Sequence, residues 1–227
     1  VGDSMNKQKI SKIFKRLEDK FSRDYKIELD YINDYTLLIA VLLSAQATDK
    51  GVNKATEDLF KIASTPEDML KLGEDGVKQY VKSINYFNNK SKNIIKLSKI
   101  LVEKFNSQVP SNREDLESLP GVGRKTANVV LNIAFNTPEI AVDTHVFRVS
   151  NRIGLVKADN VLETEMQLKK IIPENYVSFV NHWLVLLGRY ICKAKKPDCE
   201  NCPIKDLCEK HIDITPSKNS KNKTNPN

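Results

Sequence analysis

Apolar residues recur along this chain at the three- and four-residue spacing of amphipathic helices, and strand-like alternation is scarce. A first helix is indicated by Ile10, Ile13, Phe14 and Leu17. The stretch 37–43 is apolar throughout, which is typical of a helix buried on all sides. Thr65 and Pro66 predict an N-cap followed by proline at the first helical position. Further helices are expected near residues 49–62, 75–84, 90–105, 162–172 and 179–191. The pattern therefore predicts an all-α fold.

Side chains that accept hydrogen bonds from free N–H groups indicate where helices begin. Asp34 is expected to cap the buried helix, and Asp143 to cap a helix that continues to about Ile153. Ser111 and Glu114 have the spacing of a capping box, in which each side chain bonds the other residue's N–H. We therefore expect a short helix to begin at Ser111.

That short helix leads into residues 119–127, which read Leu-Pro-Gly-Val-Gly-Arg-Lys-Thr-Ala. The proline ends the helix, and the glycines permit a tight turn before a second helix that begins near Arg124. The N–H groups of Gly121, Val122 and Gly123 are expected to be unpaired there, and such a turn binds anions such as phosphate. An ordinary helix–helix corner with packing glycines is the alternative.

Lys125 lies in the first turn of the second helix. The positive end of the helix dipole disfavours an ammonium group, and burial would do the same, so a neutral amine is favoured. A neutral lysine amine is a nucleophile that forms Schiff bases with carbonyl carbons. The alternative is a lysine that only pairs with a DNA phosphate. This segment by itself does not separate the two.

Two loops carry side chains that could enter a bound duplex. Gln46 lies in the polar turn 44–49, just after the buried helix, where it could equally be a solvated amide. Tyr86 and Phe87 lie in the linker 85–89. Exposed aromatic side chains can stack on bases, although most aromatic side chains serve packing.

The four cysteines fall within 17 residues and have the spacing Cys-x6-Cys-x2-Cys-x5-Cys: Cys192, Cys199, Cys202 and Cys208. Clustered thiolates indicate a metal site. Two disulfides are the alternative, which the absence of a secretion signal disfavours. Zinc usually takes two short Cys-x2–4-Cys pairs, whereas Pro203 after Cys202 is typical of iron–sulfur ligands. Spacing favours iron–sulfur and leaves zinc open.

Lysine and arginine outnumber aspartate and glutamate by 36 to 29, a net charge of +7, which suits a nucleic-acid partner. Lys193, Lys195 and Lys196 form a basic loop between the first two cysteines, either as a phosphate contact or as a solvated surface loop. The longest apolar run is too short to cross a membrane, so we expect no membrane partner and a cytoplasmic protein.

Together these pieces resemble the bacterial endonuclease III family, DNA glycosylases with AP lyase activity in the helix–hairpin–helix superfamily. The resemblance rests on residues 119–128, on Val-Asp-Thr-His at 142–145 and on the cysteine spacing. It extends to residues 42–49 and 182–184, and runs from about Met5 to Glu209.

The resemblance implies two helical domains with a DNA-binding cleft between them. One is a six-helix barrel, residues 27–137, with the helix–hairpin–helix at about 112–134. The other, an iron–sulfur domain, joins residues 5–26 to 138–213, and a polar tail, 214–227, is expected to be disordered. The implied partner is double-stranded DNA with damaged bases or abasic sites, chiefly oxidised pyrimidines. A monomer is expected, associated with the nucleoid when bound to DNA.

The resemblance also implies catalytic and cofactor roles. Lys125 matches the family's amine nucleophile, and Asp143 its catalytic aspartate. The four cysteines match the ligands of a [4Fe–4S] cluster. Carbonyls of the hairpin match a site that can hold a monovalent cation: Glu117, Leu119 and Val122.

DNA-binding roles follow in the same way. Gln46 matches a residue that fills the gap left by a flipped nucleotide. Tyr86 stands where the family usually has an apolar wedge, which puts the details of lesion probing in doubt. The remaining implied contacts are with the DNA backbone, from Gly121, Val122, Gly123, Arg124, Lys193, Lys195 and Lys196.

Three other functions compete with this one. A single-function mismatch adenine glycosylase has the same fold but lacks the hairpin lysine that this chain has at position 125. A non-catalytic helix–hairpin–helix DNA-binding protein with a structural metal cluster would not explain why Lys125 accompanies Asp143. An electron carrier is disfavoured by the large, basic helical body.

Overall fold

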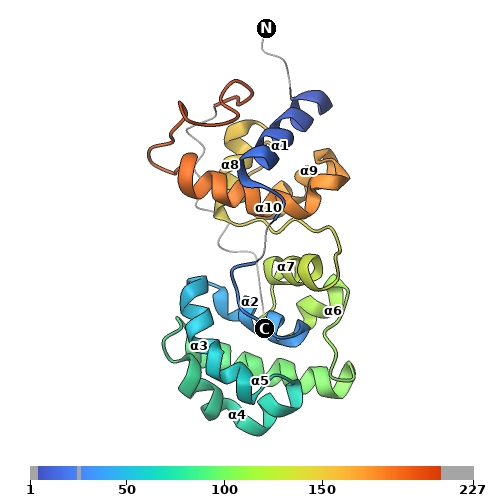
Figure 1. The fold of residues 1–227 in the computed structure, drawn as a ribbon. Helices are drawn as coiled ribbons and strands as arrows, with labels where there is room; N and C mark the ends of the chain where they lie inside the picture. The colour runs from blue at the N-terminus through green and yellow to red at the C-terminus, as the bar shows by residue number, and fades with distance from the viewer. Residues whose placement is uncertain (1–4, 25–26, 211–227) are drawn as a thin grey trace. The chain divides into compact units, whose positions relative to one another are not determined.

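Helices and loops make up the part of the chain that the computed structural model describes, residues 5–24 and 27–210 (Figure 1). The all-α fold is thereby confirmed. Backbone contacts divide the chain into two compact units. We call residues 26–139 the continuous unit, and residues 1–25 with 140–227 the discontinuous unit. No helix within the described ranges is long and apolar enough to cross a bilayer. The expected disordered tail, 214–227, lies outside the described residues.

The continuous unit has six helices in its described part: α2 (Asp34–Ser44), α3 (Asp49–Ile62), α4 (Pro66–Val81), α5 (Phe87–Lys104), α6 (Arg113–Ser118) and α7 (Arg124–Ala134). Every α2 side chain from Tyr35 to Leu43 is buried, and α3, α5 and α7 all pack against it. The hydroxyl of the buried Tyr35 lies 2.6 Å from Oγ of Ser98 on α5, so this side chain's polar group is hydrogen-bonded. The prediction of a helix buried on all sides is confirmed.

The predicted helix start at Thr65 and Pro66 is confirmed, whereas α5 begins earlier than its apolar pattern indicated. α4 begins at Pro66, because Thr65 accepts the N–H of Asp68 at 3.2 Å and proline suits the first helical position. Gly73, at φ +72°, is non-helical and kinks α4, so the segment expected as a separate helix from Asp75 is the part of α4 that follows this kink. α5 begins at Phe87 rather than at Lys90.

Two capping predictions were wrong by one residue. α6 is capped by Asn112, which accepts the N–H of Asp115 at 2.9 Å, and not by Ser111. α2 is capped by Asn33, which accepts the N–H of Thr36 at 2.9 Å. Asp34 is the first residue inside that helix, where its charge suits the helix dipole.

The discontinuous unit joins the first helix to the last ones: α1 (Lys7–Phe21), α8 (Thr144–Ile153), α9 (Val161–Ile171), η1 (Glu174–Tyr176), α10 (Val177–Leu186) and the π-helical turn η2 (Leu187–Ile191). α10 packs against both α1 and α8. The four apolar positions predicted for the first helix are all buried in this core, next to the fully buried Trp183.

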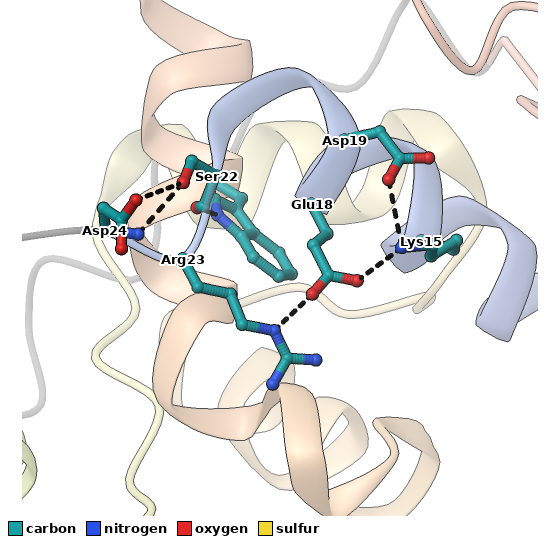
Figure 2. Close-up of polar contacts among 7 residues, drawn as sticks. Lys15, Glu18, Asp19, Ser22, Arg23 and Asp24 are labelled. Carbon is teal, nitrogen blue, oxygen red and sulfur yellow. Dashed lines mark hydrogen bonds and ion pairs between the residues drawn. The ribbon is translucent and has the colours of Figure 1, made fainter.

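The C-terminal end of α1 is fixed to this core by polar contacts (Figure 2). The indole N–H of Trp183 donates to the carbonyl of Ser22 at 2.8 Å. Glu18 pairs with both Lys15 and Arg23, and these contacts, Arg23 first, hold its pKa below the ordinary value. The Arg23 guanidinium also lies 5.3 Å from the ring centre of Phe179. The chain is therefore held in place up to the residues that lead out of this unit.

Candidate functional site

The glycine turn between α6 and α7 is shaped by its first glycine. Gly121 has φ +81°, and a Cβ there would lie 2.8 Å from the side-chain nitrogen of Asn93. Gly123 has φ −94° and open space around its Cα. The turn therefore requires glycine at position 121, whereas the fold alone does not require it at position 123.

Two buried side chains of the turn, Leu119 and Val122, belong to the core of the continuous unit. The N–H of Val122 donates to the carbonyl of Leu119 at 3.0 Å, so the expectation that this N–H is unpaired was wrong. The N–H groups of Gly121 and Gly123 have no partner among the described residues. Two free donors thus remain at the start of α7, where the helix dipole is positive.

α6 and α7 are braced against each other by Arg113. Its Nε donates to Oδ1 of Asn128 at 2.9 Å, and its guanidinium also pairs with Glu139. Arg124, at the first position of α7, lies 3.9 Å from a carboxylate oxygen of Glu117. The two helices therefore hold the turn between them as a rigid corner.

Lys125 is the second residue of α7, in its first turn, as predicted. Its side chain is exposed. The expectation that burial helps to keep this amine neutral was therefore wrong for this structure. In sequence, Lys125 follows the glycine turn by two residues, at the positive end of α7.

Asp143 caps α8 in the discontinuous unit, which confirms the predicted cap. Its Oδ1 accepts the N–H groups of His145 and Val146, both at 2.9 Å. Oδ2 has no hydrogen bond within the described ranges, and the side chain is half-buried. One oxygen is thus fixed by the helix, while the other is available to a ligand.

The four cysteines are free thiols, and together they line one pocket behind η2, a space of about 360 Å³ that is partly open to solvent. The disulfide alternative is therefore wrong. Apolar side chains complete the wall, among them Ile153, Leu187 and Ile204. In the described part of the chain, no three His, Cys, Asp or Glu side chains are placed to hold a single metal ion. Four cysteine thiols around one pocket fit an iron–sulfur cluster, which takes four cysteine ligands.

Donors around the pocket suit thiolate sulfur. Nη1 of Arg152 lies 3.8 Å from Sγ of Cys192, and the N–H of Lys210 lies 3.3 Å from Sγ of Cys208. Burial raises the pKa of Cys208 and of Cys202, and the neighbouring cysteines add to this. Burial therefore disfavours the thiolates, which a bound cluster would stabilise.

The sequence analysis missed two arginines: Arg152 holds the basic loop 193–196, and Arg148 holds the backbone just before it. Arg152, almost fully buried, donates to the carbonyls of Lys193 and Ala194, both at 2.8 Å. Arg148 donates to the carbonyls of Gly188 at 2.9 Å and Cys192 at 3.2 Å. The three lysines of the loop are exposed. Two arginines four residues apart, one helical turn from each other, were the available signal.

The two loops of the continuous unit that carry Gln46 and Tyr86 meet each other. Nδ2 of Asn85 donates to the carbonyl of Gln46 at 2.9 Å. Both Gln46 and Tyr86 are exposed, Tyr86 by 67%. Phe87 instead packs against the core, so packing is the right interpretation for that aromatic and exposure for its neighbour.

Comparisons with known proteins agree with these features. The family model described as HhH-GPD superfamily base excision DNA repair protein matches residues 39–174. The model described as iron-sulfur binding domain of endonuclease III matches residues 192–208. Endonuclease III of Rickettsia conorii is 54% identical over 92% of this chain and 100% of its own length. That of Escherichia coli K12 is 53% identical over 90% of this chain and 97% of its own.

Solved structures give the same result. A trapped covalent intermediate of endonuclease III with DNA matches with a TM-score of 0.84 at 46% identity, covering 91% of this chain and 97% of that one. A non-covalent endonuclease III–DNA complex matches with a TM-score of 0.83 over 91% and 96%. The resemblance inferred from the motifs is confirmed.

Proposed function

Because the chain belongs to the HhH-GPD superfamily of base excision DNA repair proteins, and is a DNA glycosylase and AP lyase of the endonuclease III type, we propose how its residues divide the work. Its cofactor is a [4Fe–4S] cluster at the four cysteines. The substrate is double-stranded DNA that carries an oxidised pyrimidine or an abasic site. The relatives are bacterial, so we place the enzyme in the cytoplasm, on the nucleoid.

The proposal begins with the DNA backbone. The free N–H groups of Gly121 and Gly123 bind phosphate oxygens, and Arg124 adds charge beside them. The lysines of loop 193–196 bind the backbone at a second place. A monovalent cation at the carbonyls of Glu117, Leu119 and Val122 would add positive charge under the turn. None of these contacts reads sequence, which suits an enzyme that must act wherever damage occurs.

The damaged nucleotide is then taken out of the stack, at least cost where pairing is already weak. Gln46 fills the vacated space, and Tyr86 wedges the neighbouring step. A tyrosine is bulkier than an apolar wedge and carries a hydroxyl, so this chain offers a hydrogen bond to the opposite strand at that point.

The chemistry is assigned to Lys125. Its neutral amine forms a bond to C1′ of the sugar as the glycosidic C–N bond breaks, and the base leaves with a proton. Ring opening gives an imine between Lys125 and C1′. The imine acidifies the proton on C2′, whose loss breaks the C3′–O bond and cuts the strand on the 3′ side. Water finally releases the lysine.

Asp143 is assigned to the charge that develops on the sugar. Its Oδ1 accepts the N–H groups of His145 and Val146, which keeps the carboxylate oriented. The remaining oxygen stabilises the cationic sugar as the base departs, and can carry a proton between steps.

The cluster supplies no bond-making step in this scheme. When bound, it joins the four cysteines into one rigid unit. Arg152 then holds the basic loop against that unit through backbone carbonyls, and Arg148 holds the carbonyl of Cys192 just before the loop. The loop lysines thereby meet phosphates without a large loss of loop entropy.

The exposed Lys125 beside two free N–H groups carries the mechanistic proposal, and borohydride trapping tests it. Duplexes that each carry one candidate lesion are incubated with the enzyme and reduced. A covalent adduct is expected with wild type, and its yield across lesions gives the substrate range. Lys125→Ala should form no adduct and release no base, while it still binds DNA.

Other outcomes separate the competing functions. Base release without any adduct would indicate a single-function glycosylase. DNA binding with neither adduct nor release would indicate a non-catalytic binding protein. Full lyase activity in Lys125→Ala would remove the assigned nucleophile.

A further inference from the structure

Gln46 and Tyr86, the two residues assigned to the duplex interior, both have a backbone conformation that is unusual for non-glycine residues. Gln46 has φ +57° and Tyr86 has φ +61°, both in the left-handed region. Neither residue is glycine, so the surrounding contacts must hold each conformation against its local cost. The contacts come from the first turn of α5.

Lys90 provides most of them. Its side chain is 8% exposed, and Nζ donates to the carbonyls of Leu43 at 2.8 Å and Ala45 at 2.6 Å. Burial lowers the pKa of this amine. Two carbonyl acceptors at the negative end of α2 offset that cost, since a helix C-terminus favours a cation. The buried Lys90 thus caps the C-terminal end of α2 with its side chain.

The turn after α2 is completely satisfied in hydrogen bonds. Each backbone carbonyl from 41 to 46 has a donor. Besides the two bonds from Lys90, the donor–acceptor pairs are Ser44 Oγ to Val41 at 2.8 Å, Ala45 N–H to Leu42 at 3.4 Å, Ala47 N–H to Ser44 at 3.0 Å and Asn85 Nδ2 to Gln46 at 2.9 Å. A turn whose carbonyls are all paired has little freedom, which explains how Gln46 is kept in its strained conformation.

The same lysine also holds Tyr86. The backbone N–H of Lys90 donates to the carbonyl of Tyr86 at 3.0 Å, because Tyr86 is the N-cap of α5 and Lys90 lies one turn later. One residue therefore fixes the Tyr86 loop through its backbone and the Gln46 turn through its side chain. Asn85 adds a direct bond between the two.

We infer that Lys90 and Asn85 are positioning residues that couple the Gln46 turn to the Tyr86 loop, so that both side chains enter the duplex as one preformed unit. This inference rests on the proposed roles of Gln46 and Tyr86. Because both loops are fixed before DNA binds, filling the gap costs less ordering of the protein.

A double-mutant cycle tests the coupling. Base release is measured in single turnover on a lesion duplex for wild type, Gln46→Ala, Lys90→Met and the double variant. Lys90→Met keeps the length of the side chain but removes the ammonium group. Each single change should slow base release about tenfold, and the double variant should be no more than about twofold slower than Lys90→Met alone.

A second readout separates positioning from general damage. Strand cleavage at a preformed abasic site needs less unstacking, since the base is already gone. Lys90→Met should therefore keep this activity within about threefold of wild type. Lys96→Met is the matched control, because Lys96 is an exposed lysine on the same helix. It removes the same charge and should leave both activities at the wild-type level.

Asn85→Asp covers the case in which Lys90→Met fails to fold, as judged by circular dichroism. The change is nearly isosteric and lies on the surface, but it removes the donor to Gln46. It should reproduce the selective loss of base release, and its effect should also be masked in the Gln46→Ala background.

The outcomes distinguish two failures. If Gln46→Ala alone leaves base release unchanged, the proposed role of Gln46 is wrong. If Gln46→Ala slows release by the same factor with and without Lys90 or Asn85, only the coupling is wrong. An equal loss of base release and abasic-site cleavage in Lys90→Met would also overturn it.

Discussion

At the start of α8, Asp143 uses one carboxylate oxygen as a helix cap and leaves the other without a partner among the described residues. A cap and a catalytic carboxylate have the same requirement, because both work best when the group is ionised and held in one rotamer. The two roles can nevertheless be separated by substitution, because asparagine caps a helix about as well as aspartate.

Asp143→Asn should therefore slow base release by about 10²–10⁴-fold, since it removes the charge that faces the sugar. The free energy of unfolding should stay within about 0.5 kcal/mol of wild type, because the amide oxygen still accepts the N–H groups of α8. Single-turnover kinetics and urea denaturation measure the two effects. Asp143→Ala should lose the activity and, in addition, about 1 kcal/mol of stability. Unchanged turnover in the asparagine variant would reduce Asp143 to a cap.

At the scale of elements, the α6–α7 corner depends on one of its two glycines. Gly121→Ala places a methyl group 2.8 Å from the Asn93 side chain, on a residue at φ +81°. It should lower the free energy of unfolding by about 1–3 kcal/mol, which urea denaturation would measure. Abasic-site cleavage should fall with it, because the free N–H groups turn away from the phosphate.

Gly123→Ala is the control from the same corner. Its φ of −94° suits alanine, and no atom lies within 4 Å of the added carbon. The loss of stability should stay below about 1 kcal/mol. If the two variants were equally unstable, positive φ and the contact with Asn93 would not be what fixes the turn.

How far the elements could be predicted follows from what forms them. Apolar spacing predicted most of the helices, because most of them bury one face. Proline and glycine predicted the α6–α7 corner, because their effect on the backbone is local. The caps were misplaced by one residue, at Ser111 and Asp34. Asparagine stands beside each of them as an equally good cap, and only the folded backbone decides which one accepts the N–H.

The role of Lys90 could not be predicted in this way. In the sequence it is one of several lysines along α5, and nothing local indicates that it is buried. Its acceptors at positions 43 and 45 lie more than 40 residues earlier, so its role exists only in the packed unit. Arg152 is similar, because its acceptors lie in the loop 41 and 42 residues later.

For the whole molecule, an excess of seven positive charges makes DNA binding dependent on salt. The loop 193–196 should contribute through its three exposed lysines. Their joint replacement by alanine should reduce the slope of log K against log salt concentration by about one for each phosphate that the loop no longer neutralises. Fluorescence anisotropy with an abasic duplex at several salt concentrations would measure it.

A control triple variant removes the same charge where acidic neighbours already neutralise it. Each of the control lysines pairs with an acid on its own helix: Lys61 with Asp58, Lys71 with Asp68 and Lys99 with Glu103. The slope should change much less in this variant. Equal slopes in the two triple variants would mean that net charge, and not the loop, governs binding.

Motif spacing marked Lys125, Asp143 and the four cysteines as candidates. The structure places Lys125 in the first turn of α7 and Asp143 at the cap of α8, and the cysteines line one pocket. Exposure of Lys125 and the bonded N–H of Val122 were missed, since solvent access and turn hydrogen bonds depend on the three-dimensional surroundings.

The attachment of α1 has a consequence for the newly made chain. Arg16 on this helix pairs with Asp206, 190 positions further along, and Trp183 holds the residue at its end. At ordinary rates of translation the helix therefore waits on the order of 10–40 s for its binding surface to leave the ribosome. Residues 26–139 have all their core partners long before that. During synthesis the continuous unit should therefore fold first. The amphipathic α1 should stay available to chaperones until the C-terminal residues that bind it have been made.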